Sequence, residues 1–557
     1  MCDRYDRSPD VGAGRRNEEK REKPCPDECC SDNARECGTN FLLGVLHGRH
    51  SRIIGYTEHF ANVSLWTRRR ILGDGANWYH HGMLRETYPF DRYWRDTNKP
   101  YAKSLIAFVR FLERRLGVRA EYDVARFPLG RADLHDVFEL AEKLRSRGVI
   151  SHFHPTEQFA DEPHVYQWQS HCADRTAHVA GGISGKGDKE ALLAALAESL
   201  ERYLWYEDTG YFSRSFTARA HDAVERGGIS PSRFAGFTAD QRAGNSRIML
   251  RDESTYLWVR AFSWARKKYC FVPAQTISAA HAKAAFHAHK EPMVWWPITT
   301  GLATWPTQKG AILRGALEVI ERDAYMITWL NRLSPPRIDV AELRKNSIEL
   351  DALVRQCERY RLAVTFVSMI TDAPVPVVGA LVEDKTSIGV PFALGLKASG
   401  SAADAACGAL LEALRSRSNM RRRRKAGEWN AEKKPHEIRH WERTLYWTEG
   451  KRTEQLRFLF EGPHKAVPSD THDEDSLLER IIAWCRERNY ELVSVPLTHS
   501  ALNPTPWHIE MVVMPDLQPM HQNESIPYLG GERLRTVPAM LGYSAREPFF
   551  EEPHPFA

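Results

Sequence analysis

Two distant segments of the chain carry the same Glu-x-x-Glu-Arg pattern inside stretches that otherwise have the apolar spacing of buried helices. The first copy spans Glu198–Arg202 and the second spans Glu318–Arg322. Residues at positions i, i+3 and i+4 lie on one face of an α-helix, so each copy places two carboxylates and a guanidinium group side by side. Charged side chains are rarely buried without partners. A fold that packs both helices must therefore gather these acidic faces around one cavity or leave them on the surface.

Glycine-containing turns precede both copies. Residues 181–187 (Gly-Gly-Ile-Ser-Gly-Lys-Gly) lead into the first helix, where backbone N–H groups and Lys186 can meet phosphates. A third helical segment, Ala405–Arg417, carries Glu412. Mg²⁺ takes carboxylate and phosphate oxygens, and arginine suits the remaining phosphate charge, so we interpret these segments as a phosphate and metal site. The alternative is a set of surface ion pairs, each worth about 0.2–0.5 kcal/mol.

The composition indicates a globular protein of several domains. The chain has 557 residues, which allows roughly two to four domains. Hydrophobic residues make up 42% and charged residues 27% of it, so it can bury a sizeable core and is not a disordered protein. The formal net charge of +5 is small for this length and is not typical of a dedicated nucleic-acid binder. We interpret the basic run Arg421–Lys425 as a solvated loop rather than a nucleic-acid patch.

The first 178 residues are predicted to form three parts. Residues 1–38 are polar and lack apolar periodicity, which is typical of a disordered arm. Residues 39–150 contain apolar residues at helical spacing, most clearly at 103–114 and 132–144, and are predicted to form a small, mostly helical N-terminal domain. The polar residues 151–178 are predicted to connect this domain to the main body.

The remaining residues, 179–557, are predicted to form one larger domain. Helical stretches alternate there with short β-rich runs at 256–263, 362–369 and 508–514. Such a pattern indicates an α+β body of mixed sheets and long helices. We find no internal repeat of fixed period.

Cysteines and histidines form two groups that resemble metal ligands without having the spacing of a known site. Five of the ten cysteines lie near the N-terminus, at Cys2, Cys25, Cys29, Cys30 and Cys37. They lack paired Cys-x-x-Cys spacing, so we favour reduced thiols on a flexible arm over a zinc site. Five histidines lie within residues 151–178 but lack i, i+4 pairing, so we favour a solvated connector over a metal site there.

The sequence also predicts where the protein is found. No apolar run reaches the roughly 18–20 residues that cross a bilayer. The N-terminal residues are charged, and no apolar stretch follows them, so they are not expected to be a signal peptide. We therefore expect a cytoplasmic protein that does not associate with membranes.

In this order, these segments resemble the YcaO superfamily, most closely its azoline-forming cyclodehydratases. The resemblance covers about residues 179–557 and includes the later stretches Met514–His521, Tyr528–Leu534 and Val537–Gly542. The C-terminal residues Glu552–Ala557 resemble the proline-rich tail of the family. The resemblance implies that residues 179–557 form a YcaO-like ATP-binding domain with a proline-rich C-terminal tail.

The resemblance implies ATP and Mg²⁺ as cofactors and assigns the site by position. It assigns Mg²⁺ to Glu198, Glu201, Glu318 and Glu321, the nucleotide to Lys186, Glu198, Arg202, Arg322, Glu412 and Arg417, and organisation of the active site to Pro553, Pro555 and Ala557 in the tail. ATP would activate a backbone amide of a ribosomally made precursor peptide. A Cys, Ser or Thr side chain of the peptide adds to the preceding carbonyl carbon. The former carbonyl oxygen then takes phosphate from ATP, and elimination of this phosphate leaves an azoline. The substrate supplies the nucleophile, so no protein nucleophile is needed.

The implied partners follow from the same resemblance. They are the precursor peptide, a separate leader-binding protein of the ubiquitin-activating-like (ocin-ThiF-like) type, a flavin dehydrogenase and a second copy of the chain in a homodimer. No nucleic acid is expected.

Several residues differ from the family pattern and motivate two alternatives. The substituted positions are Ala194, Thr300, Ala303, Pro306, Gly310, Gly408, Arg415 and Ala557. Because a family carboxylate is replaced at Gly310 and polar loop residues at Thr300 and Pro306, one alternative is a catalytically silent scaffold that binds a peptide or partner enzyme. The other is thioamide formation from a sulfide source, although the proline-rich tail favours ring formation.

Overall fold

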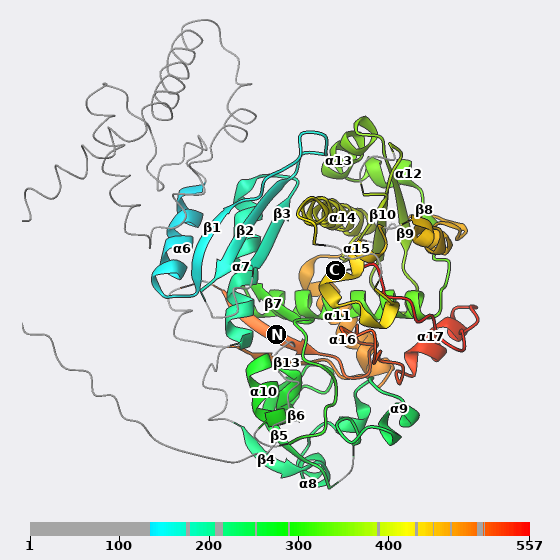
Figure 1. Cartoon of the computed structure of the whole chain (residues 1–557). Coiled ribbons are helices and arrows are strands. Elements are labelled where there is room, and N and C mark those ends of the chain that lie inside the picture. Colours follow the sequence, from blue (N-terminus) through cyan, green and yellow to red (C-terminus); the bar gives the residue numbers. More distant parts are fainter. Residues whose placement is uncertain are drawn as a thin grey trace, which may run out of the picture. The chain divides into compact units, whose positions relative to one another are not determined.

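The computed structural model describes residues 134–556 apart from short gaps (Figure 1). The gaps are 174–178, 207–214, 251–252, 288–289, 387–389, 429–432, 449, 468–470, 498–504 and 506. The predicted arm at 1–38, the N-terminal cysteines, the predicted helix at 103–114 and most of the predicted N-terminal domain at 39–150 lie outside the described residues. Among the helices that the structure describes, none combines the length and the apolar character that crossing a membrane requires.

The first sheet is antiparallel and has the order β1-β2-β3. Its strands are β1 (Ile150–Pro155), β2 (Tyr166–Cys172) and β3 (Val179–Ser184). One face packs against α6 (His135–Ser146) and α7 (Asp188–Tyr206). The helix predicted at 132–144 is thereby confirmed in α6.

This sheet corrects our prediction for residues 151–178, because they contain two strands rather than a solvated connector. Trp168, Ser170 and Cys172 alternate along β2 and are buried on the side of α7, where Trp168 Nε1 donates to Asp188 Oδ1 at 2.8 Å and Cys172 Sγ to the Ser199 carbonyl. Such alternation is typical of a strand buried on one face. Histidines and glutamines between the buried residues gave the segment its polar composition.

The second sheet has the order β11-β10-β9-β8-β12. Its strands are β8 (Arg337–Ile338), β9 (Leu362–Ser368), β10 (Val377–Asp384), β11 (Phe392–Ala398) and β12 (His464–Lys465). The sheet packs against α13 (Ile348–Arg359) and α14 (Ala402–Lys425), with α12 (Val340–Lys345) alongside.

The basic run Arg421–Lys425 is the end of α14, so the prediction of a solvated loop is wrong. Arg421 pairs with Asp161 at 3.0 Å and with Glu162 at 2.9 Å. Basic side chains stabilise the C-terminal end of a helix because their positive charge lies near the negative end of the helix dipole. The run therefore has a structural explanation.

The third sheet has the order β4-β5-β13-β14-β7, and β6 pairs with β5. Its strands are β4 (Phe216–Arg219), β5 (Thr255–Ser263), β6 (Lys268–Pro273), β7 (Leu302–Trp305), β13 (Val493–Pro496) and β14 (His508–Val513). Helix α11 (Gln308–Leu330) packs on β14 and β7. The predicted strands at 256–263, 362–369 and 508–514 are confirmed as β5, β9 and β14. The mixed body of sheets and long helices is confirmed as well.

The remaining α-helices pack around these layers. They are α8 (Ala220–Glu225), α9 (Ala239–Ala243), α10 (Ala279–His287), α15 (Arg443–Tyr446), α16 (Glu474–Glu487) and α17 (Arg533–Met540).

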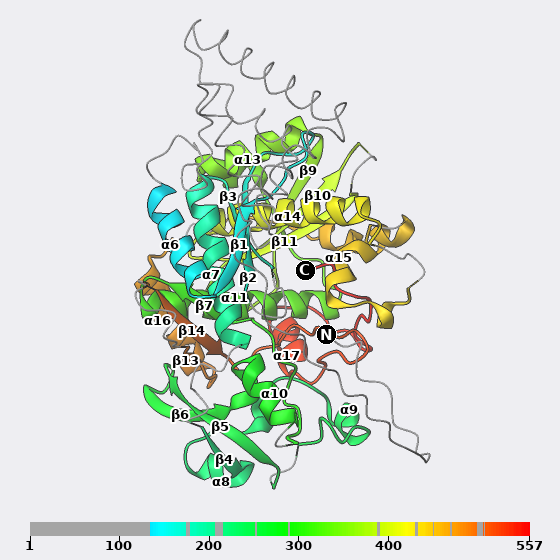
Figure 2. The ribbon, with the colours of Figure 1, turned by 60° about the vertical axis from the view of Figure 1, so that its left-hand side comes forward.

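Three strand–turn–helix units recur in this fold: β3–α7, β7–α11 and β11–α14. Their helices lie near one another in both views (Figures 1 and 2). Two of the strands approach their helices through glycine: a Cβ at Gly182 would lie 1.8 Å from the Ala191 carbonyl oxygen, and one at Gly395 would lie 2.1 Å from that of Ala409. The close approach brings the strand backbone within reach of helix side chains.

Candidate functional site

Each of these three helices carries a glutamate ten residues after its first residue. The side chain turns back to the strand segment before its own helix and accepts a hydrogen bond from a backbone amide there. The pairs are Gly181 N with Glu198 Oε2 at 2.9 Å, Gly301 N with Glu318 Oε2 at 3.1 Å, and Leu396 N with Glu412 Oε2 at 2.8 Å. The three units therefore hold equivalent carboxylates in equivalent ways.

Three residues further along, each helix contacts the strand of another unit. Glu201 lies against Thr304 of β7, Glu321 Oε2 accepts from the Ala398 amide of β11 at 2.8 Å, and Arg415 Nη1 donates to the Gly181 carbonyl of β3 at 2.9 Å. These contacts lead from the first unit to the second, from the second to the third, and from the third back to the first. We call Glu198, Glu201, Glu318, Glu321 and Glu412 the carboxylate ring.

Two arginines form hydrogen bonds with carboxylates of the ring on their own helices. Arg202 donates to Glu198 Oε1 from Nε at 3.1 Å and from Nη2 at 2.6 Å. Arg322 donates to Glu321 and, at 3.2 Å, to Glu318 Oε1. The Nε atom of Arg322 is buried and has no hydrogen-bond partner among the described residues. The ring thus contains arginine nitrogens as well as carboxylate oxygens.

The carboxylates of the ring act on one another electrostatically. Burial raises the pKa of Glu201 to about 8, and the charges of Glu198 and Glu318 add to this shift. Burial also raises the pKa values of Glu318 and Glu412, and the charge of Glu321 raises both further. Burial alone would raise the pKa of Glu198 too, but Arg202, Arg415 and the Gly181 amide together lower it. The ring therefore lacks enough positive charge to ionise fully, and a cation would stabilise it.

Parts of the ring remain accessible. The side chains of Glu198, Glu318 and Glu412 keep 30%, 32% and 24% of their surface exposed. Glu321 is buried, with 5% of its side chain exposed. Carboxylate oxygens are the ligands that Mg²⁺ prefers, and arginine binds phosphate, so this donor set fits a magnesium nucleotide.

Comparison with known proteins assigns the domain. The family model described as "YcaO cyclodehydratase, ATP-ad Mg2+-binding" matches residues 184–518, which include α7, the whole β7–α11 unit and the whole β11–α14 unit. The chain belongs to the YcaO family. No curated protein sequence gives a significant match.

Solved structures that match this chain include heterocyclases and another YcaO protein. A "Heterocyclase in complex with substrate and Cofactor" matches with a TM-score of 0.59 and 17% identity over 74% of this chain. This chain spans 57% of that protein's length. A YcaO protein from Methanopyrus kandleri bound with AMPPCP and Mg²⁺ has a TM-score of 0.48, with 19% identity over 70% of this chain and 91% of that one. The heterocyclase TruD has a TM-score of 0.47, with 15% identity over 70% of this chain and 61% of that one.

The C-terminal tail of this YcaO chain packs against α11 and ends beside the ring. The carbonyl groups of Glu552 and Pro553 accept hydrogen bonds from the indole nitrogens of Trp329 and Trp447. Phe556 is buried, and the Arg322 guanidinium lies over its ring at 4.4 Å. Both views show this segment ending near α11 and α14 (Figures 1 and 2). Ala557 lies outside the described residues.

The structure places Lys186 and Arg417 in other contacts. Lys186 is 69% exposed and pairs with Glu349 at 3.6 Å. Arg417 is buried and pairs with Asp384 at 2.6 Å. In the contacts of the described residues, neither reaches the carboxylate ring. By contrast, Glu198, Glu201, Arg202, Glu318, Glu321, Arg322 and Glu412 are brought together.

Two basic residues near the ring were absent from the predicted site. Arg415 pairs with Glu412 at 3.8 Å as well as with β3, and Lys397 of β11 acts electrostatically on Glu318. Arg415 occupies the position on α14 that Glu201 and Glu321 occupy on their helices. The constant offset from each helix start is the sequence signal that would have identified it.

The first turn of α11 leaves little room for a side chain at Gly310. Gly310 stands where the resemblance led us to expect a carboxylate, and a Cβ there would lie 1.9 Å from Cδ1 of Trp305. The Arg314 guanidinium stacks over the Trp305 ring at 3.1 Å. The side chains of Trp305 and Thr307 therefore occupy the space into which a longer side chain at this position would extend.

Proposed function

We propose that this chain binds MgATP at the carboxylate ring and activates backbone amides of a ribosomally made precursor peptide, converting Cys, Ser or Thr residues into azolines. The observation that carries this proposal is the closure of three strand–helix units around five carboxylates. The resulting site has many acidic ligands, adjacent arginines and accessible oxygens. Phosphoryl transfer depends on such positioning and charge neutralisation.

In this proposal each residue has a role that its contacts support. Glu198, Glu201, Glu318 and Glu321 hold Mg²⁺, while Glu412 completes the nucleotide site. Arg202 and Arg322 are fixed by carboxylates on their own helices, so their charges are positioned before phosphate binds. Bound MgATP would supply the phosphoryl group that makes the amide oxygen a leaving group. Lys186 and Arg417 are left out because their contacts lie elsewhere.

The tail belongs to the same proposal. Pro553 and Pro555 are buried, and Phe556 covers Arg322, so the tail positions an arginine that holds two ring carboxylates. We therefore propose that the tail organises the active site rather than contacting the reacting atoms.

Partners are proposed on the same basis. We propose a separate leader-binding protein of the ubiquitin-activating-like type for the precursor peptide, as the resemblance to the azoline-forming cyclodehydratases implies. We also propose that a flavin dehydrogenase acts on the azoline product and that the chain forms a homodimer.

A scaffold without catalytic activity is the second candidate, and one observation favours it. Trp305 and Thr307 fill the space beside Gly310, where the family resemblance implies a carboxylate. A third candidate, thioamide formation, uses the same activated amide with sulfide as the nucleophile.

The test combines the purified chain, its leader-binding partner, MgATP and a Cys-, Ser- and Thr-rich peptide encoded beside its gene. We expect phosphate release that depends on the peptide, and loss of one water per modified residue by mass spectrometry. Replacement of oxygen by sulfur would instead identify a thioamide-forming enzyme. Peptide binding without phosphate release or mass change would identify a scaffold.

A further inference from the structure

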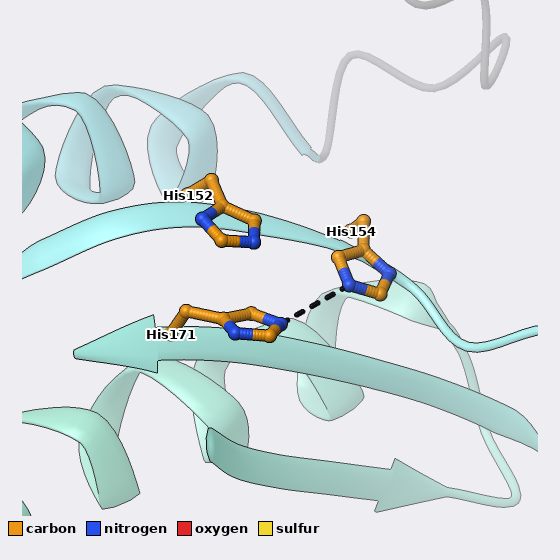
Figure 3. Close-up of side chains that lie close together, drawn as sticks. All are labelled: His152, His154 and His171. Atoms are coloured by element: carbon orange, nitrogen blue, oxygen red, sulfur yellow. Dashed lines mark hydrogen bonds between the residues drawn. The ribbon is translucent and has the colours of Figure 1, made fainter. Parts of the chain in front are cut away.

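Three histidines gather on the face of the first sheet that points away from α6 and α7 (Figure 3). His152 and His154 are two residues apart on β1, and His171 lies opposite His152 on β2. Because side chains alternate along a strand, Phe153 and Trp168 point to the other face, where both contact Phe138 of α6. We call His152, His154 and His171 the histidine cluster. Its residues come from strands that contribute nothing to the carboxylate ring.

The spacing of the three imidazoles suits a tetrahedral metal ion. His154 Nε2 and His171 Nε2 lie 3.3 Å apart. One ligand nitrogen from each histidine lies within 4.8 Å of the others. Two nitrogens bound tetrahedrally to zinc, each at roughly 2.0–2.1 Å, are themselves about 3.3 Å apart. The pair is therefore already at ligand spacing, and the third nitrogen is within reach.

Neighbouring groups orient two of the rings. The Pro155 carbonyl can only accept, so His154 Nδ1 donates to it at 3.0 Å, and His154 Nε2 then accepts from His171 Nε2 with the lone pair that a metal ion would take in its place. The Ser151 hydroxyl donates to the His171 carbonyl at 3.3 Å and can accept from His152 Nδ1 at 2.9 Å. In the neutral tautomer in which His152 Nδ1 donates to Ser151, the lone pair that a metal ion would bind is on His152 Nε2. Second-shell hydrogen bonds of this kind orient metal-bound histidines.

We propose that His152, His154 and His171 bind one divalent transition-metal ion of the zinc class. Imidazole nitrogens favour zinc, cobalt, nickel and copper, whereas Mg²⁺ prefers oxygen. Each of the three side chains is partly exposed, so an ion can reach them. The site is chemically distinct from the carboxylate ring and does not depend on the function proposed for it.

Metal binding by the full-length chain tests this proposal. Zn²⁺ stoichiometry is measured by elemental analysis after dialysis, and Co²⁺ binding is followed by its electronic spectrum, in which thiolate ligands from the N-terminal cysteines give a separate charge-transfer band. The variants are His152→Ala, His154→Ala and His171→Ala. The matched control is His164→Ala, an exposed histidine on the same segment outside the histidine cluster.

We expect each cluster variant to lose one metal equivalent per chain, or to bind it at least about tenfold more weakly, while His164→Ala keeps it. Ser151→Ala should weaken binding about 10- to 100-fold without removing a ligand, since it loosens the His152 ring. Circular dichroism checks that the half-exposed alanine variants remain folded. Equal stoichiometry and affinity in the wild type and His171→Ala would overturn the proposal. Equal loss in His164→Ala would also overturn it, since it would show adventitious binding to surface histidines.

Discussion

Glu321 differs from the other ring residues because it is buried and links two units. One oxygen accepts the Ala398 amide of β11, and the other pairs with Arg322. Glu321→Gln keeps a carbonyl oxygen for the amide but removes the charge. We expect this variant to remain folded and to lose nucleotide turnover, measured as phosphate release.

Glu491→Gln is the control for that variant. Glu491 is buried and paired with Arg266 and Arg233, away from the ring. The control should keep its turnover even where its stability falls. Turnover by Glu321→Gln at the wild-type rate would remove Glu321 from the metal site.

Glu510 predicts a pH dependence of stability. It is buried on β14 beside Gln308, and burial raises its pKa to about 7. Folding raises the pKa of this carboxyl above its unfolded value of about 4.3, so the folded chain holds the proton more tightly than the unfolded chain. This contribution to the free energy of unfolding is fully present below about pH 4.3 and is lost as the pH rises toward 7. We expect Glu510→Gln to be about 2–3 kcal/mol more stable than the wild type at pH 8 and nearly equal at pH 4.5. Urea unfolding at both pH values measures this, and an equal difference at both would contradict it.

Among the elements, the packing of β3 on α7 predicts a sharp steric requirement. A Cβ at Gly182 would meet the Ala191 carbonyl oxygen and the Ala195 amide nitrogen, which belong to the helix backbone. We expect Gly182→Ala to lower the free energy of unfolding by about 3 kcal/mol, as forced overpacking does. Gly244→Ala is the control, because nothing lies within 4 Å of a Cβ there. Equal stability of the two variants in urea would contradict the close approach.

The sequence predicted the three helices but not their equivalence. Their first residues are separated by 120 and 94 positions, so no fixed period exists, and α14 has Arg415 where the other helices have a second glutamate. The carboxylates accept hydrogen bonds from the backbone amides of Gly181, Gly301 and Leu396. Almost every residue type has such an amide, so the sequence does not show which ones take part. Glu–Arg spacing therefore indicated which side chains meet, while the closure of the ring became visible only in the structure.

The histidine cluster was missed for a related reason. We tested residues 151–178 for i, i+4 pairs, which is the spacing of a helix. The cluster instead joins two positions on one strand to a cross-strand neighbour. Because the segment forms two antiparallel strands, the three histidines lie on the same face of the sheet.

At the scale of the whole molecule, the C-terminal tail reaches the carboxylate ring through an aromatic contact between Phe556 and Arg322. Phe556 covers Arg322, and a desolvated cation–π contact is worth about 2 kcal/mol. We expect Phe556→Ala to lower phosphate release at least about tenfold. Phe549→Ala is a matched control, because Phe549 is also buried but lies under Arg535 at 5.0 Å, outside the ring. Equal effects of the two variants on release would show that the tail acts only through stability.

Equilibrium binding of a non-hydrolysable ATP analogue tests the central claim most directly. Calorimetric titration with and without Mg²⁺ compares the wild type, Glu198→Gln, Glu318→Gln and the control Glu349→Gln, which changes the partner of Lys186. We predict one Mg²⁺-dependent nucleotide per chain, at least about tenfold weaker binding in both ring variants, and no change in the control. Nucleotide binding that ignores Mg²⁺, or that survives both ring substitutions unchanged, would contradict the assignment of the carboxylate ring.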